Sequence, residues 1–126
     1  MWSITRRSVL VVCVVAITAC AASTPSATVA SFDHLIEAGK YDQAIALLST
    51  SARGMFPDDK MKAQMASESA KMRAGGGIKS MAFVNEAVNG DTATLTATTT
   101  LANGKTSSEN FSLLREAGEW RITIGK

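Results

Sequence analysis

Cysteine, histidine and proline are scarce in this chain of 126 residues. The two cysteines, Cys13 and Cys20, both lie near the start, so residues 21–126 contain no thiol. This absence excludes disulfide bonds, thiol catalysis and cysteine-rich metal sites from the rest of the chain. A hydrophobic core alone must stabilise the folded part, and the chain is long enough for one small domain. We expect no metal ion and no cofactor.

An excess of charge of one sign is also missing beyond residue 19. The 13 basic residues include Arg6 and Arg7, and the 11 that remain match the 11 acidic residues. A nucleic-acid-binding protein needs a basic patch to neutralise phosphates. We therefore expect no nucleic acid as a partner.

No apolar run is long enough to span a bilayer, which takes about 20 residues. Two arginines precede an apolar stretch over residues 9–17, and small residues follow that stretch. This order is typical of a secretory signal. We expect residues 1–19 to be a signal peptide that is removed by cleavage between Ala19 and Cys20.

The residues around this cleavage point, Ile17-Thr18-Ala19-Cys20, resemble the bacterial lipobox. The resemblance implies a diacylglyceryl group on the Cys20 sulfur, and two or more acyl chains hold a protein stably on a bilayer. Ala21 follows the cysteine, as in lipoproteins of the outer membrane. We expect a protein anchored to the bilayer through Cys20, facing the periplasm, with a flexible tether over residues 20–30.

A helical period begins at Ser31. Apolar residues share one helical face in three segments that end at or near glycines, namely residues 32–38, 41–48 and 57–74. Asp58 and Asp59 lie at the start of the third segment, where the helix dipole favours negative charge. The first half of the domain is therefore predicted to be helical.

The period changes to two after Gly75-Gly76-Gly77, and residues 81–88 and 92–101 are predicted strands. Turn signals at residues 89–91, 103–104 and 116–119 predict two further strands, each joined to the one before it by a hairpin. Four antiparallel strands after helices predict one α+β domain over residues 31–126. The inward-facing Ala93 and Ala97 are small, which favours a closely packed helix; a sheet curved around a pocket is the alternative.

Several of these segments together resemble a known family. They are Ala38-Gly39-Lys40-Tyr41-Asp42-Gln43-Ala44, Gly76-Gly77-Ile78-Lys79-Ser80, Asn89-Gly90-Asp91-Thr92-Ala93 and Glu116-Ala117-Gly118-Glu119-Trp120-Arg121-Ile122. The chain resembles small bacterial lipoproteins of unknown function in the nuclear transport factor two-like (cystatin-like) superfamily. The resemblance implies a cone-shaped fold, with a curved sheet wrapped over the helices and often a homodimer. It also implies a superfamily of isomerases, cyclases, dehydratases and pure binding proteins, so the fold does not decide function.

Three polar residues are candidates for a pocket in such a cone: His34, Tyr41 and Asn85. A histidine suits a general base near neutral pH, but a partly exposed position on the first helix is the favoured interpretation of His34. Neighbouring helical residues point about 100° apart, so Tyr41 and Asp42 do not face one another, and Tyr41 is expected in the core. The sequence predicts no catalytic residue.

These observations favour a membrane-tethered, non-catalytic binding or interaction module. An immunity-type lipoprotein that neutralises an incoming toxin is one concrete form of this function. The alternative is a small-molecule carrier, or an isomerase- or dehydratase-type enzyme, that uses the cone pocket. A cone filled by leucine, phenylalanine and methionine would exclude this alternative, and an open pocket with titratable groups would favour it. The ligand is expected to be a protein or a small molecule.

Overall fold

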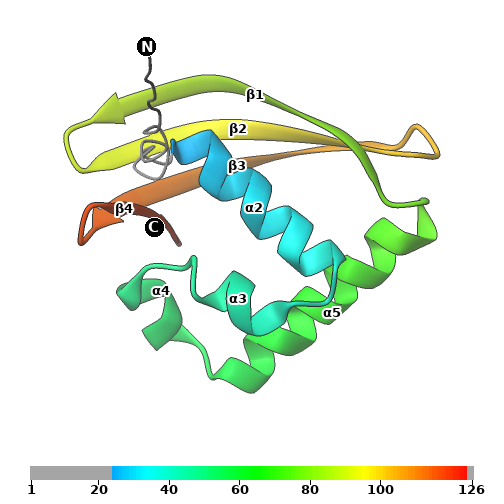
Figure 1. The fold of residues 1–126 in the computed structure, drawn as a ribbon, viewed down its shortest axis with the longest axis horizontal. Coiled ribbons are helices and arrows are strands. Elements are labelled where there is room, and N and C mark those ends of the chain that lie inside the picture. Colours follow the sequence, from blue (N-terminus) through cyan, green and yellow to red (C-terminus); the bar gives the residue numbers. More distant parts are fainter. Residues whose placement is uncertain (1–23, 125–126) are drawn as a thin grey trace, which may run out of the picture.

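The computed structural model describes residues 24–124, so the predicted signal peptide, Ala19 and Cys20 lie outside the described residues. Helices come first: α2 (Pro25–Glu37), α3 (Tyr41–Ile45), α4 (Thr50–Met55) and α5 (Asp58–Ala74). Strands follow: β1 (Ile78–Asn89), β2 (Thr92–Leu101), β3 (Thr106–Glu116) and β4 (Glu119–Thr123). Helices followed by a curved antiparallel sheet confirm the predicted α+β class (Figure 1).

The first helix begins earlier than the sequence predicted. Thr24 caps α2, since its side-chain oxygen accepts a hydrogen bond of 3.1 Å from the Ala27 N–H, and Pro25 occupies the first helical turn. Threonine before proline is a favourable helix start, and Pro25 and Val29 are buried. Residues 25–30 are therefore part of the folded domain. The predicted tether was too long because these mostly small residues show no clear apolar period.

The predicted second helix, residues 41–48, is shorter in the structure. The chain leaves α3 and forms a parallel bridge between Leu48 and Ile122 of β4. The Ser49 N–H donates to the Ile122 carbonyl at 2.7 Å, and the Ser49 hydroxyl accepts from the Ala52 N–H at 3.1 Å to cap α4. Pairing with the edge of the sheet thus ends one helix and starts another.

The four strands form a meander in the order β1-β2-β3-β4, all antiparallel. The alternation predicted for β2 is confirmed, because Ala93, Leu95 and Ala97 are buried. On the opposite face, the Thr96 hydroxyl donates to the Asn110 side chain at 2.7 Å. One face of β2 thus belongs to the core and the other carries polar side chains.

A bulge in β1 joins the sheet to α2. The pairing with β2 shifts between Val84 and Ala87, where Asn85 takes a positive φ of 57°. Such a bulge bends the strand. Glu86 in the bulge accepts a hydrogen bond of 3.3 Å from the Ser26 N–H, so a carboxylate lies at the positive end of α2.

Glu37, the last residue of α2, connects this helix to α5 and β1. Its carboxylate accepts a hydrogen bond from the Ile78 N–H. Its carbonyl oxygen accepts from the Ser69 hydroxyl at 3.3 Å and from Arg73 at 3.0 and 3.1 Å. Gly77 has a φ of 90°, which favours glycine, and a Cβ there would lie 2.9 Å from the Glu37 carboxylate, which would have to shift.

Helix α2 is the centre of the packing. It contacts α3, α5, β1, β2 and β4, and Figure 1 shows it lying across the sheet with α5 on its other side. Leu113 and Val29 are almost fully buried. The other large core residues are Ile36, Ile45, Leu48, Met61, Met65, Leu95, Phe111, Trp120 and Ile122. The sheet, α2 and α5 leave an open space between them.

Candidate functional site

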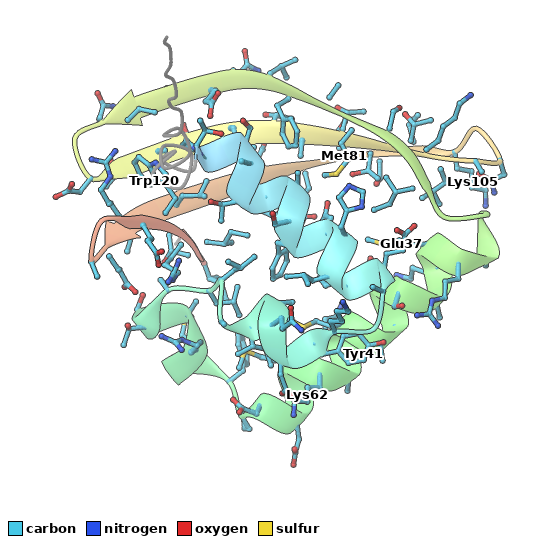
Figure 2. The ribbon with its side chains drawn as sticks, in the orientation of Figure 1. Glu37, Tyr41, Lys62, Met81, Lys105 and Trp120 are labelled. Carbon is cyan, nitrogen blue, oxygen red and sulfur yellow. The ribbon has the colours of Figure 1, made fainter. Side chains whose placement is uncertain are left out.

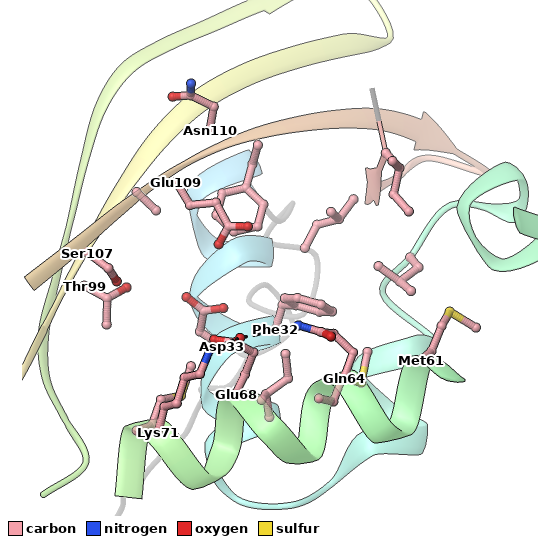
Figure 3. A pocket seen from close by; sticks show the side chains of 18 of the residues that line it. Phe32, Asp33, Met61, Gln64, Glu68, Lys71, Thr99, Ser107, Glu109 and Asn110 are labelled. Atoms are coloured by element: carbon pink, nitrogen blue, oxygen red, sulfur yellow. Dashed lines mark hydrogen bonds and ion pairs between the residues drawn. The ribbon is translucent and has the colours of Figure 1, made fainter. Parts of the chain in front are cut away.

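A cavity of about 1360 Å³ lies between the sheet and the helices α2 and α5. Its lining comes from α2, α5, β2, β3 and β4, together with residues near α3 and α4, so helices and sheet form it together. Figure 3 shows α5 on one side of this space and β3 on the other. The cone is therefore open, which favours a small-molecule binding site.

Much of the cavity wall is apolar. Its apolar lining residues are Phe32, Ile36, Leu48, Phe56, Met61, Ala63, Met65, Met72, Ala97, Leu101, Phe111, Ile122 and Ile124. Most of these side chains belong to the core or pack against it, but Phe56 and Ile124 are 46% and 44% exposed. An apolar wall with partly exposed apolar side chains suits a ligand with an apolar body.

Three carboxyl side chains enter the same cavity from three elements. Asp33 comes from α2, Glu68 from α5 and Glu109 from β3. Figure 3 shows Asp33 between the other two. Thr99 of β2 also lines the cavity and is only 9% exposed. This end of the cavity is polar and acidic, in contrast to the apolar wall.

The surroundings of Asp33 disfavour its charged form. Burial, together with the negative charges of Glu109 and Glu68, raises the pKa of Asp33 from 3.8 to about 7, while interaction with the Thr99 hydroxyl opposes the rise. Partial withdrawal from water also raises the pKa of Glu109, which is still exposed to solvent, with a smaller contribution from Glu68. Proton uptake at this end of the cavity therefore falls in the neutral pH range.

Among residues 24–124, a basic side chain forms an ion pair with one of these three carboxylates. The Lys71 Nζ lies 3.2 Å from Glu68. Within residues 24–124, neither Asp33 nor Glu109 forms an ion pair with a lysine, arginine or histidine. Lys105 also lines the cavity, but it is exposed and lies at the β2–β3 hairpin, far from Trp120 at the other end of the sheet (Figure 2).

None of the three predicted pocket residues lines this cavity. His34 is on the exposed side of α2, with its Nδ1 3.8 Å from Glu37 and a side chain 58% exposed. Tyr41 begins α3 and packs against the core, away from the sheet (Figure 2). Asn85 lies exposed in the bulge of β1. The interpretation of His34 as a surface residue and Tyr41 as a packing residue agrees with these positions.

The acidic residues that do line the cavity were missed, although the sequence contained a signal. Asp33 lies four residues after Val29 and three before Ile36, on the apolar stripe of α2. Glu68 lies three residues after Met65, and Glu109 lies two before the inward Phe111. A carboxylate at an apolar position of three separate elements is the pattern that points to this site.

The described residues add two further findings. Among residues 24–124, no group of three or more histidine, cysteine, aspartate or glutamate side chains is arranged to hold a metal ion. In the same range, no helix has both the length and the apolar character needed to cross a membrane. Cys20 and Ala19 lie outside the described residues, so lipidation and cleavage stay predictions.

Solved structures share this architecture and define its class. A Campylobacter jejuni protein assigned as an NTF2-like transpeptidase superposes with a TM-score of 0.73 at 20% identity, covering 82% of this chain and 100% of its own. A SEC-C motif-containing protein from Rhodopseudomonas palustris superposes with a TM-score of 0.55 at 16% identity, covering 82% of this chain and 77% of its own. A Thiobacillus denitrificans protein assigned as a calcium/calmodulin-dependent protein kinase type II association domain superposes with a TM-score of 0.51 at 16% identity. This match covers 83% of this chain and 98% of that protein. The fold is NTF2-like.

At the level of sequence, the chain belongs to a family described as a domain of unknown function, DUF4878, whose model matches residues 18–123. No curated protein matches the chain. The family and the fold are therefore compatible with many activities, and the chemistry of the site is what distinguishes them.

Proposed function

We propose that the protein is a non-catalytic binding module, held by lipid on Cys20 at the periplasmic face of the outer membrane, whose working surface is the cavity. The observation that carries the proposal is the cavity of about 1360 Å³, which the core side chains leave open. Protein interiors are normally packed to the density of organic crystals. An open space of this size, with apolar walls and a few polar groups, is the usual form of a ligand site.

The anchor is supported by the sequence before the domain. The lipobox-like residues 17–20 stand only a few positions before Thr24, which caps the first packed helix. Three residues separate Cys20 from Thr24, and an extended chain spans about 3.3–3.6 Å per residue. A lipidated Cys20 would therefore keep the domain close to the bilayer, where it would meet molecules that enter or leave the membrane.

The cavity can be tested with a neutral probe and two neighbouring residues. Ser107 lines the cavity, whereas Ser108 hydrogen-bonds to Thr98 at 2.9 Å on the opposite face of β3. We expect 4-phenylbutan-1-ol to bind the mature lipidated protein in phosphatidylcholine nanodiscs. We expect Ser108→Trp to leave this binding unchanged and Ser107→Trp to weaken it, because an indole would occupy part of the cavity.

Binding is followed by NMR titration, with empty nanodiscs as the blank and circular dichroism as a check that both variants fold. If wild type binds neither this alcohol nor a charged probe with the same phenylbutyl body above the blank, the cavity is not a ligand site and the proposal fails. If the two tryptophan variants lose binding equally, the probe binds elsewhere, which also contradicts the proposal.

A proton-transferring enzyme of the isomerase or dehydratase type is a second candidate, because the pKa of Asp33 is raised to about 7. A general base works best when its pKa lies near the working pH. This candidate requires Asp33 to exchange a proton with a carbon acid bound in the cavity. Deuterium incorporation from D₂O into a bound ketone, lost in Asp33→Asn, would support it; no incorporation by wild type would exclude it for that substrate class.

A further inference from the structure

The cavity has two chemically different parts, and together they describe the shape of a ligand. One part is apolar and includes Met65, Phe111 and Ile122. The other contains Asp33 from α2 and Glu109 from β3 (Figure 3). A molecule that fills both parts must be apolar along its body and polar at one end.

The negative charge of the carboxylates at the polar end determines which charge a bound ligand can carry. Removing a carboxylate from water is unfavourable unless a cation or several hydrogen-bond donors compensate. Within residues 24–124, neither the partly buried Asp33 nor Glu109, which is exposed to solvent, has such a cation, so the cost of lost hydration falls mainly on Asp33. A cationic group would be attracted to both carboxylates, and an anionic group would be repelled.

The lysines on the cavity lining do not reverse this preference. Lys71 is 3.2 Å from Glu68, which balances its charge, and its side chain is 70% exposed. Lys60 and Lys105 are exposed to solvent, where water and salt screen their charges. The groups that are withdrawn from solvent are the carboxylate of Asp33 and the hydroxyl of Thr99.

We propose, on the basis of the proposed function, that the cavity binds cationic amphiphiles: molecules with a protonated amine and an apolar body. The amine lies between Asp33 and Glu109 and donates hydrogen bonds to their carboxylates, since an ammonium group has three donors and no acceptor. The apolar body lies against Phe111 and the methionines of α5.

Three probes with one apolar body and different head groups test this assignment: 4-phenylbutylamine, 4-phenylbutan-1-ol and 4-phenylbutyrate. At pH 8 the amine is cationic, the alcohol neutral and the acid anionic. We expect the mature protein in phosphatidylcholine nanodiscs to bind the amine about tenfold more tightly than the alcohol, because one additional charge pair contributes on the order of 1.4 kcal/mol. We expect the acid to bind most weakly.

Two charge-removing variants and one matched control locate the effect. We expect Asp33→Asn and Glu109→Gln each to reduce the affinity for the amine several-fold and to leave the affinity for the alcohol within twofold. Asp91→Asn removes an exposed carboxylate at the β1–β2 turn, away from the cavity lining, and should change neither. Circular dichroism and thermal unfolding establish that each variant is folded.

The outcomes separate this inference from the function on which it rests. Equal affinities for amine and alcohol, or an amine affinity unchanged in Asp33→Asn and Glu109→Gln, would overturn the cationic ligand and leave cavity binding intact. Failure of all three probes to bind would overturn the binding function itself. Equal weakening by Asp91→Asn would show that only the net charge of the protein matters, which would also overturn the assignment.

Discussion

Asp33 on α2 and Glu109 on β3 belong to the same cavity, and the negative charge of Glu109 helps to raise the pKa of Asp33. These residues are 76 positions apart in the chain. Asp33 is partly buried beside Glu109 with no cation partner within residues 24–124, which disfavours its charged form, and perturbed groups of this kind are concentrated at functional sites. Their pairing is the reason to regard the cavity as a site and not as a packing fault.

The stability of the protein should depend on pH through Asp33. Its pKa is about 7 in the folded state, against 3.8 for an unperturbed aspartate, so folding strengthens proton binding. This contribution to the free energy of unfolding is fully favourable below about pH 4, and it is lost as the pH rises to about 7. The groups that face Asp33 are Glu109, Glu68 and Thr99.

Asp33→Asn should remove this dependence, because an amide carries no charge at any of these pH values. We expect the variant to be more stable than wild type at pH 8 by on the order of 1 kcal/mol, with a smaller difference at pH 5. Urea denaturation at both pH values measures this, with Asp91→Asn as the control. If the free energy of unfolding rose by the same amount at pH 5 and pH 8, Asp33 would not be the group that titrates between these pH values.

Two glycines should respond to alanine in opposite ways. Gly77 has a φ of 90° and lies where a Cβ would be 2.9 Å from the Glu37 carboxylate, so Gly77→Ala should lower the free energy of unfolding by about 1–3 kcal/mol. Gly54 is in α4 with nothing within 4 Å of an added Cβ, so Gly54→Ala should raise it by about 0.5–1 kcal/mol. Chemical denaturation compares the two, and a Gly77→Ala protein as stable as wild type would contradict the backbone strain expected from the positive φ of Gly77.

The two cysteines should differ in their effect on membrane attachment. Cys20→Ser removes the predicted lipid acceptor, so we expect loss of the lipid mass and failure of signal cleavage. Cys13→Ser changes only the predicted signal peptide and should leave the mature mass unchanged. Intact-mass spectrometry of the membrane fraction measures both. A mature protein of unchanged mass and unchanged membrane retention in Cys20→Ser would show that the lipoprotein prediction is wrong.

Much of the fold was predictable because its signals are local. The alternation of β2 depends only on which side of a strand each residue faces, and the turn residues around Gly90 and Gly118 specify hairpins by their own backbone preferences. The start of α2 was also available locally, in Thr24 and Pro25. The division of residues 41–55 into two helices could not be predicted locally. It depends on backbone hydrogen bonds that join Leu47 and Ser49 to Ile122, far away in the chain.

The sequence by itself determined that α2, α5 and β3 each carry an acidic residue on the side that faces the interior. Helical and strand periods are enough to place Asp33, Glu68 and Glu109 on those sides. Only the tertiary structure decided that the three sides meet around one open cavity while His34, Tyr41 and Asn85 lie elsewhere. The reason is that a period fixes the direction of a side chain relative to its own element, whereas a cavity depends on how separate elements pack.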